Sequence, residues 1–369
     1  MQLSFERNEL FDNLQIVQNV AGGRNTLPIL ANILIKAQDG VIECAATDLE
    51  VAIKVKVDGT ITEEGEITIS AKKFVDIVRE LPDKEIELTT TANDRVELTC
   101  GDGVYKIVGL SSEDFPEIPA ANGSGLTIDG DTLNAVIRKT EFAASTEEVQ
   151  FLLNGLFIKL LEDKTEVVAT DRNYLALAHC PPLSTTEDIT EFILPLKAVK
   201  EIQRTFADSS TVRMTPLNNQ LLFTDGNATL TTRLVEGNYP DYHIIIPDSS
   251  EGRTVVSKDS ILRAARRVSL LSNPKNNAIC LEINTDQIQL SAKTPELGEA
   301  HETLQIESGS GSVRIGLDAR MLTDVLSHIE TESLVLEYTD ETSPFIVKPE
   351  GDDGHLCIIS PMRLDTVHQ

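Results

Sequence analysis

The chain has 369 residues, of which 41% are apolar and 25% are charged, and its formal net charge is −27. No apolar run is long enough to span a bilayer and the first residues lack a signal-peptide pattern, so we expect a cytoplasmic protein with no membrane partner. The five scattered cysteines include no Cys-x-x-Cys pair, which argues against a disulfide framework or a zinc site and favours buried thiols.

A sequence pattern recurs three times along the chain. Ala46-Thr47-Asp48 returns 123 positions later as Ala169-Thr170-Asp171. Asp102-Gly103 returns as Asp225-Gly226 and again as Asp353-Gly354. Such periodicity is typical of a tandem array of like domains. We therefore expect three domains, at residues 1–123, 124–250 and 251–369, with connectors at 117–125 and 239–252 where Pro and Gly interrupt the pattern.

Each copy is predicted to hold two helices and several short strands. Residues 41–57 are rich in β-branched residues and follow Asp39-Gly40, which predicts a hairpin. Residues 279–290 should fold back likewise around residues 284–286. Apolar residues recur with a helical period at Phe74, Ile77, Val78 and Leu81, and again at Leu322, Val325, Leu326 and Ile329. The fold class is therefore α+β, with two helices packed on antiparallel sheets in each of three tandem domains.

Basic residues gather on predicted helices in all three copies, although the whole chain is acidic. They are Lys72, Lys73 and Arg79 in the first copy, Arg138, Lys139, Lys197, Lys200 and Arg204 in the second, and Arg263, Arg266 and Arg267 in the third. The spacing of Lys197, Lys200 and Arg204 puts three charges on one helix face. One interpretation is an ordinary solvated face. Recurrence in three copies favours the other, a surface that holds DNA loosely inside an acidic body.

Motifs of catalysis are missing from the sequence. It contains no Gly-x-x-x-x-Gly-Lys loop, no His-Glu-x-x-His and no Gly-x-Ser-x-Gly. Residues 308–312, Ser-Gly-Ser-Gly-Ser, lack the lysine of a phosphate-binding loop and are predicted to be a flexible surface loop. Asp48 and Asp171 are candidates for a carboxylate pair, but each is more simply a turn residue that bonds the nearby backbone. His355 and Cys357 need two further ligands to bind a metal. We expect no catalytic residue, cofactor or metal.

Two apolar stretches lie where polar connectors are expected. Residues 239–247 combine two Tyr with three Ile, and residues 358–364 include Met362 and end on Leu364. Most such side chains pack into the core. Those that stay open form a groove, and the adaptable thioether of Met362 suits a site that accepts several ligands.

Taken in order across the three repeats, several short motifs resemble one family. They are Gly22-Gly23-Arg24 with Thr26-Leu27-Pro28-Ile29-Leu30, Thr47-Asp48-Leu49-Glu50, Asp114-Phe115-Pro116, Leu153-Asn154-Gly155, Ala169-Thr170-Asp171, Tyr239-Pro240-Asp241-Tyr242, Leu271-Ser272-Asn273 and Pro361-Met362-Arg363-Leu364. Over residues 1–364 the chain resembles the bacterial sliding clamps, the beta subunits of DNA polymerase III. The resemblance implies a head-to-tail homodimeric ring of six clamp domains, with helices lining the hole and sheets outside.

The resemblance also implies a function without catalysis. The ring would encircle double-stranded DNA without reading its sequence and act as a processivity factor that tethers the replicative polymerase. The polymerase catalytic subunit, the clamp loader and repair proteins would bind through short linear motifs, in a pocket between the second and third domains.

The resemblance carries over to particular residues of this chain. DNA contacts are expected at Arg24, Lys72, Lys73, Arg79 and Lys197, to which the helix-face argument adds Arg138, Lys200 and Arg204. The partner pocket is expected at Thr170, Arg172, Tyr174, Leu175, Pro240, Ile244, Ile245, Ile358, Ile359, Pro361, Met362, Arg363 and Leu364. Apolar contacts of the dimer are expected at Tyr105, Leu270 and Leu271.

The chain departs from the usual pattern of this family in three places. Arg172-Asn173-Tyr174 stands where Gly-His-Arg is common, Ile244 replaces a frequent Arg, and Asp365 to Gln369 extend past the usual end. The location of the pocket is therefore better defined than its peptide preference. Two alternatives stay open on the residues alone: an acidic three-domain interaction scaffold that does not encircle DNA, and an enzyme that uses Asp48 and Asp171.

Overall fold

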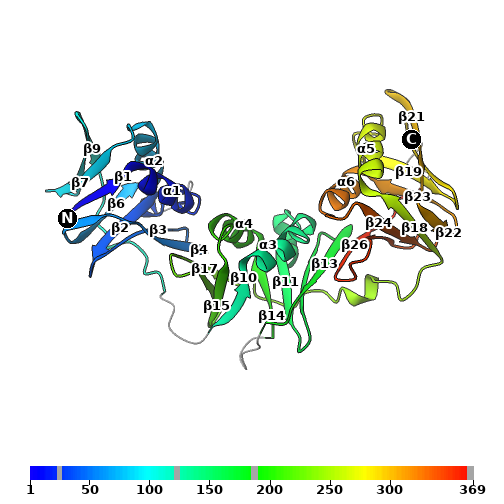
Figure 1. Cartoon of the computed structure of the whole chain (residues 1–369), viewed down its shortest axis with the longest axis horizontal. Coiled ribbons are helices and arrows are strands. Elements are labelled where there is room, and N and C mark those ends of the chain that lie inside the picture. Colours follow the sequence, from blue (N-terminus) through cyan, green and yellow to red (C-terminus); the bar gives the residue numbers. More distant parts are fainter. Residues whose placement is uncertain (23–26, 120–124, 184–189, 364–369) are drawn as a thin grey trace. The chain divides into compact units, whose positions relative to one another are not determined.

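The computed structural model describes residues 1–22, 27–119, 125–183 and 190–363 (Figure 1). The described chain contains two α-helices in each sequence repeat, as the sequence predicts. They are α1 (Arg7–Gln18), α2 (Ala71–Glu80), α3 (Gly130–Arg138), α4 (Leu196–Thr205), α5 (Lys258–Ser269) and α6 (Ala319–Ser327). The chain divides into two compact units, one of residues 1–133 and 197–234 and the other of residues 134–196 and 235–363. The middle repeat therefore contributes to both units.

The first unit contains two antiparallel sheets. The smaller sheet has the order β5 (Thr60–Glu63), β1 (Gln2–Glu6), β7 (Glu85–Thr91), β8 (Arg95–Cys100) and β9 (Gly103–Val108). The larger sheet has the order β10 (Leu126–Asp129), β15 (Thr211–Leu217), β16 (Gln220–Thr224), β17 (Ala228–Arg233), β4 (Val51–Lys56), β3 (Val41–Thr47), β2 (Asn32–Gln38) and β6 (Gly65–Ser70). Strand β17 of the second repeat pairs with β4 of the first, from Ala228 opposite Val55 to Thr232 opposite Val51.

The second unit repeats this plan. Its larger sheet has the order β14 (Glu191–Pro195), β11 (Gly155–Leu160), β12 (Thr165–Thr170), β13 (Tyr174–Cys180), β26 (His355–Ile359), β25 (Phe345–Pro349), β24 (Ser333–Tyr338), β18 (Gly252–Ser257) and β22 (Ser308–Ser310). Its smaller sheet has the order β21 (Gly298–Gln305), β20 (Gln287–Thr294), β19 (Ala278–Ile283) and β23 (Val313–Asp318). Here β13 of the second repeat pairs with β26 of the third.

The predicted helical stripes face the cores. On α2, Phe74 and Val78 are fully buried, and α1 packs against α2 and against strands β3 and β4. On α6, Leu322, Val325 and Leu326 are fully buried. Figure 1 shows α5 and α6 side by side in the third repeat, and contacts between the two helices agree. The apolar faces of the helices therefore close the cores against the sheets.

The predicted hairpins are confirmed. Asp39 and Gly40 connect β2 to β3 with φ angles of 52° and 78°, the left-handed values that a tight two-residue hairpin turn requires. Strands β19 and β20 pair around residues 284–286, where the Asn284 side chain accepts hydrogen bonds from the backbone N–H groups of Asp286 (3.0 Å) and Gln287 (2.9 Å). Local turn chemistry thus sets the register of both hairpins.

The prediction of a flexible loop at residues 308–312 is wrong for residues 308–310. Ser308–Ser310 form the edge strand β22 and pair with Val255, Thr254 and Arg253 of β18. A side chain at Gly309 would have its Cβ only 2.6 Å from Ile306 Cδ1, so glycine permits this close approach. Small residues here serve strand pairing rather than flexibility.

The recurring Thr-Asp pairs form one kind of turn. Asp171 Oδ1 accepts hydrogen bonds from the backbone N–H groups of Asn173 (2.8 Å) and Tyr174 (3.1 Å), while Thr170 Oγ1 donates to Tyr174 O (2.7 Å). Asp48 accepts from the N–H groups of Glu50 and Val51 in the same way. The turn interpretation of both aspartates is confirmed, because each carboxylate satisfies its own backbone.

We predict that Asp171→Ala lowers the free energy of unfolding by about 1–2 kcal/mol, because two backbone donors lose their charged acceptor. Urea denaturation measures this loss. The matched variant Asp171→Asn keeps a side-chain oxygen at the same position and should lose much less. Equal losses in the two variants would show that the turn does not depend on this acceptor.

Candidate functional site

The second unit contains an open apolar cavity of about 500 Å³. Three segments form it: the short 3₁₀ helix η3 (Glu148–Leu153), the turn between β12 and β13, and the connector that contains the 3₁₀ helix η4 (His243–Ile245). The lining residues are Val149, Gln150, Phe151, Leu152, Leu153, Thr170, Arg172, Pro240, Asp241, Tyr242, Ile244 and Ile245. The predicted connector therefore forms one wall of a cavity.

Large apolar side chains at this cavity are unusually exposed. The exposed fraction is 90% for Val149, 58% for Phe151, 81% for Ile244 and 40% for Ile245. An apolar cluster of this kind on a folded surface marks a binding site for another molecule. Arg172, whose φ of 83° is left-handed, adds the one cationic side chain among the lining residues.

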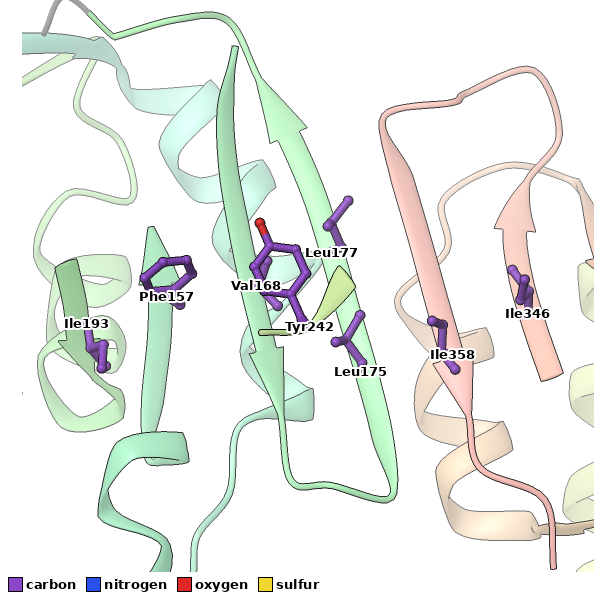
Figure 2. Close-up of a cluster of buried hydrophobic side chains, with 8 residues drawn as sticks. All are labelled: Phe157, Val168, Leu175, Leu177, Ile193, Tyr242, Ile346 and Ile358. Atoms are coloured by element: carbon purple, nitrogen blue, oxygen red, sulfur yellow. The ribbon is translucent and has the colours of Figure 1, made fainter. Parts of the chain in front are cut away.

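Beneath the cavity lies a buried apolar core, shown in Figure 2. Its members are Phe157, Val168, Leu175, Leu177, Ile193, Tyr242, Ile346 and Ile358. Leu175 on β13 is paired directly with Ile358 on β26, so strands of two repeats build this core. Tyr242 belongs both to the core and to the cavity lining, and thereby connects the open site to the sheet.

The structure brings five of the predicted pocket residues together in the cavity lining: Thr170, Arg172, Pro240, Ile244 and Ile245. Leu175, Ile358 and Ile359 are instead buried in the core. Pro361, Met362 and Arg363 are not among the lining residues, and Leu364 lies outside the described residues. Met362 packs against Ala278 and Cys280, and its backbone N–H donates to Gly316 O at 2.8 Å.

Tyr174 is also not among the lining residues of the cavity. Its hydroxyl donates to the backbone oxygen of Phe142 at 2.5 Å, and the two rings lie 5.9 Å apart. Burial raises the pKa of this phenol above its ordinary value, and the nearby carboxylates of Asp171, Asp324 and Asp318 add to the rise. Tyr174 therefore fastens β13 to the segment after α3.

The wall formed by residues 149–153 was not predicted from the sequence. These residues form a short 3₁₀ helix with a kink at Gln150, so their apolar side chains follow neither a helical nor a strand period. The run of apolar residues ahead of strand β11 was the available signal. It does not distinguish an exposed wall from a buried segment.

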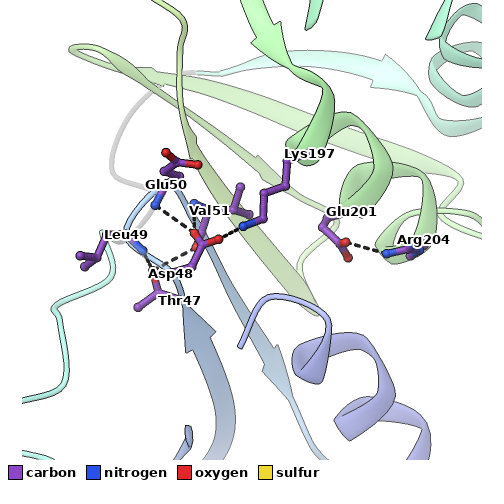
Figure 3. Close-up of polar contacts among 8 residues, drawn as sticks. All are labelled: Thr47, Asp48, Leu49, Glu50, Val51, Lys197, Glu201 and Arg204. Carbon is purple, nitrogen blue, oxygen red and sulfur yellow. Dashed lines mark hydrogen bonds and ion pairs between the residues drawn. The ribbon is translucent and has the colours of Figure 1, made fainter. Parts of the chain in front are cut away.

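Two basic residues of α4, Lys197 and Arg204, make local ion pairs, as Figure 3 shows. Lys197 pairs with Asp48 in the turn between β3 and β4, and Arg204 Nη1 donates to Glu201 Oε1 at 2.6 Å. Burial lowers the pKa of Lys197 and raises the pKa of Glu201. Lys200 is exposed. Lys197 thus connects α4 to the neighbouring strands of its own unit.

The other predicted DNA contacts lie on helix surfaces. Lys72 and Lys73 are exposed at the start of α2, and Arg79 pairs with Asp76 at 3.3 Å on the same helix. Arg138 at the end of α3 pairs with Glu330 at 3.6 Å. Arg24 lies outside the described residues.

The predicted dimer residues lie at or near the surface. Tyr105 is 39% exposed on β9, the edge strand of its sheet, where Val104 and Val108 are also exposed. Leu270 is 75% exposed just after α5. Leu271 is half-buried, and its backbone oxygen accepts from Thr294 Oγ1 at 2.8 Å.

The described part of the chain was also compared with what a metal site, a reactive thiol or a membrane-spanning helix requires. It holds no group of three or more His, Cys, Asp or Glu side chains arranged to bind a metal. All five cysteines are free and buried, which confirms the thiol prediction, and burial raises the pKa of Cys44 to about 12. His355 is buried, which lowers its pKa to about 4. Among the described helices, none has the length and apolar character needed to cross a membrane.

Comparison with known proteins agrees with this architecture over the whole chain. The three matching family models are the DNA polymerase III beta subunit N-terminal domain at residues 1–119, its central domain at 127–241 and its C-terminal domain at 243–363. The beta sliding clamp of Caulobacter vibrioides is 32% identical, with 99% of this chain and 100% of that protein covered.

Solved structures give the same result. The DNA polymerase sliding clamp of Bacillus subtilis superposes with a TM-score of 0.94 at 26% identity, covering 98% of this chain and 99% of the other. The sliding clamp of Bartonella birtlesii, determined bound to griselimycin, gives 0.94 at 29% identity, covering 99% and 100%. The chain therefore belongs to the DNA polymerase III beta subunit family, the beta sliding clamps, with three tandem clamp domains and a DNA-clamp function rather than that of an acidic scaffold.

Proposed function

We propose that this sliding clamp encircles duplex DNA as a head-to-tail homodimer and tethers a replicative polymerase through the apolar cavity at Phe151 and Ile244. The exposed apolar lining of that cavity is the observation that supports the tethering role. The clamp loader and repair proteins use the same cavity in turn through short peptide segments. The protein works in the bacterial cytoplasm on the chromosome and is not itself catalytic.

The chemistry of the cavity suits an apolar peptide segment. Burial of one large apolar side chain contributes about 1.5–3 kcal/mol, so two or three such anchors give a useful affinity. Arg172 is available to a carboxylate at the rim of the cavity. The Bartonella birtlesii clamp was determined bound to griselimycin, and we expect this ligand to bind the present chain at the apolar cavity.

The proposed hold on DNA is topological and blind to sequence. With a net charge of −27, the protein repels DNA at long range, and weak contacts from Lys72, Lys73 and Lys200 suffice once the duplex is enclosed. Ion pairs that already involve Lys197, Arg204, Arg79 and Arg138 weaken their attraction to phosphate. Weak attraction is what a protein needs in order to slide.

For ring closure, we propose that the exposed edge strand β9 of one protomer meets the end of α5 on its partner. Val104, Tyr105 and Val108 on β9 and Leu270 after α5 supply apolar area, as homodimer interfaces require. An edge strand also offers unpaired backbone groups that a second chain can pair with.

We predict that Tyr105→Ala combined with Leu270→Ala gives monomers in sedimentation equilibrium, because the interface loses its largest exposed apolar groups. Leu110→Ala is the matched control. Leu110 is likewise an exposed apolar residue, at 44%, but it lies outside the proposed contact. An unchanged dimer in the double variant would place the interface elsewhere.

We predict that Lys72→Ala, Lys73→Ala and Lys200→Ala together shorten retention on nicked circular plasmid. They should also flatten its dependence on salt by up to about three units of log–log slope, roughly one for each lysine that no longer reaches a phosphate. Lys293→Ala on β20 is the control, because that strand carries no predicted DNA contact. Linearising the plasmid should release every variant. A triple variant with the wild-type salt response would argue against these contacts.

We predict that Phe151→Ala with Ile244→Ala weakens griselimycin binding by at least about tenfold in calorimetry, because two apolar anchors are removed. The protein should remain dimeric, and the exposed control Leu110→Ala should bind as the wild type does. Wild-type affinity in the double variant would exclude this cavity as the ligand site.

A further inference from the structure

A buried hydrogen bond connects the cavity to the interior of the middle repeat. The hydroxyl of Tyr242 donates to Glu166 Oε2 at 2.6 Å, and the two residues are only 4% and 5% exposed. Glu166 is not among the lining residues of the cavity, whereas Tyr242 is. Glu166, which does not line the cavity, therefore holds Tyr242, which does.

Two side chains lie against the other oxygen of Glu166, a lysine and a histidine whose pKa burial and the neighbouring lysine lower. Lys164 Nζ lies 2.9 Å from Glu166 Oε1, and His179 Nε2 lies 3.2 Å from the same oxygen. His179 stands directly opposite Glu166 in the pairing of β12 with β13. Burial by itself raises the pKa of Glu166, but hydrogen bonds from Tyr242 and Lys164 outweigh it and leave that pKa below its ordinary value. The carboxylate is thus ionised and accepts strongly from the phenol.

Tyr242 connects the hydrogen bond with Glu166 to the wall of the cavity. Figure 2 shows the Tyr242 ring among Val168, Leu175 and Leu177. Tyr239, three residues earlier, stacks on Phe157 at 4.8 Å between ring centres. Pro240 lies between these two aromatic residues in the chain. Ile244 and Ile245, which line the open cavity, follow Tyr242 after one intervening residue. If Tyr242 shifted, the wall that it carries would shift with it.

We propose that Glu166 is a positioning residue for the partner pocket: with Lys164 and His179 it fixes Tyr242, and so holds the 240–245 wall ready to receive an apolar ligand. A wall that is ordered before binding costs the ligand less conformational entropy. The inference rests on the proposed function of the cavity. It adds a determinant of affinity that lies behind the surface and makes no contact with the partner.

The test uses the full-length protein with griselimycin as the probe, and measures affinity by calorimetry and melting temperature in parallel. Glu166→Ala and Tyr242→Phe should each weaken binding by about tenfold, because the ligand must then supply about 1.4 kcal/mol to order the wall. Glu166→Gln keeps an oxygen that accepts from the phenol and should recover most of the affinity. The double variant Glu166→Ala/Tyr242→Phe should bind no more weakly than either single variant, because the two residues act as one unit.

Glu191→Ala is the matched control for loss of a carboxylate near Tyr242, since Glu191 is exposed and makes no hydrogen bond to that phenol. The control should bind as the wild type does. A lower melting temperature with unchanged affinity in Glu166→Ala and Tyr242→Phe would overturn the inference and leave Glu166 a purely structural residue. Additive losses in the double variant would overturn it as well.

Failure of the wild-type protein to bind griselimycin would count instead against the proposed function of the cavity. If Glu166→Ala does not fold, the comparison of Tyr242→Phe with Glu166→Gln decides the matter. Weakening in Tyr242→Phe alone supports the inference, and equal affinity of both variants with the wild type refutes it.

Discussion

Backbone pairing between strands of different repeats is the constraint on which the rest of this structure depends. The ladder between β4 and β17 joins the first repeat to the second, and the ladder between β13 and β26 joins the second to the third. Each ladder turns two sheet edges into the middle of one continuous sheet. The second ladder also builds the core under the cavity, because Leu175 and Ile358 meet across it. The position of the cavity follows from how the repeats are joined.

The sequence predicts those parts of the fold that local signals control. Asp39 and Gly40 specify a hairpin through their left-handed φ angles, and the stripe around Phe74 specifies a buried helix face. The joined sheets and the edge strand β22 could not be predicted in this way, because partners such as Thr254 and Gly309 are far apart in the chain. The Ser-Gly composition of β22 even argues for a loop, since it has little intrinsic strand preference.

The residues of the candidate site also fall into those that local sequence signals predict and those that they do not. Pro240 and Ile244 were predictable because apolar residues in a connector are conspicuous. Val149 and Phe151 were not, since a short irregular helix has no period that marks its exposed face. Charge was also only partly predictable. Counting basic residues finds Lys197, but the pairing that ties it to Asp48 depends on the folded turn between β3 and β4.

The exposure of Val149 and Ile244 has a consequence for how ligands compete for the cavity. Apolar side chains this exposed gain free energy from any apolar occupant, so the cavity has little intrinsic preference for one apolar ligand over another. Under the proposed function, partners that share the cavity therefore compete for it. Occupancy is then set by the relative concentrations and dissociation rates of these partners. A scarce partner occupies the cavity only if it dissociates more slowly than its competitors.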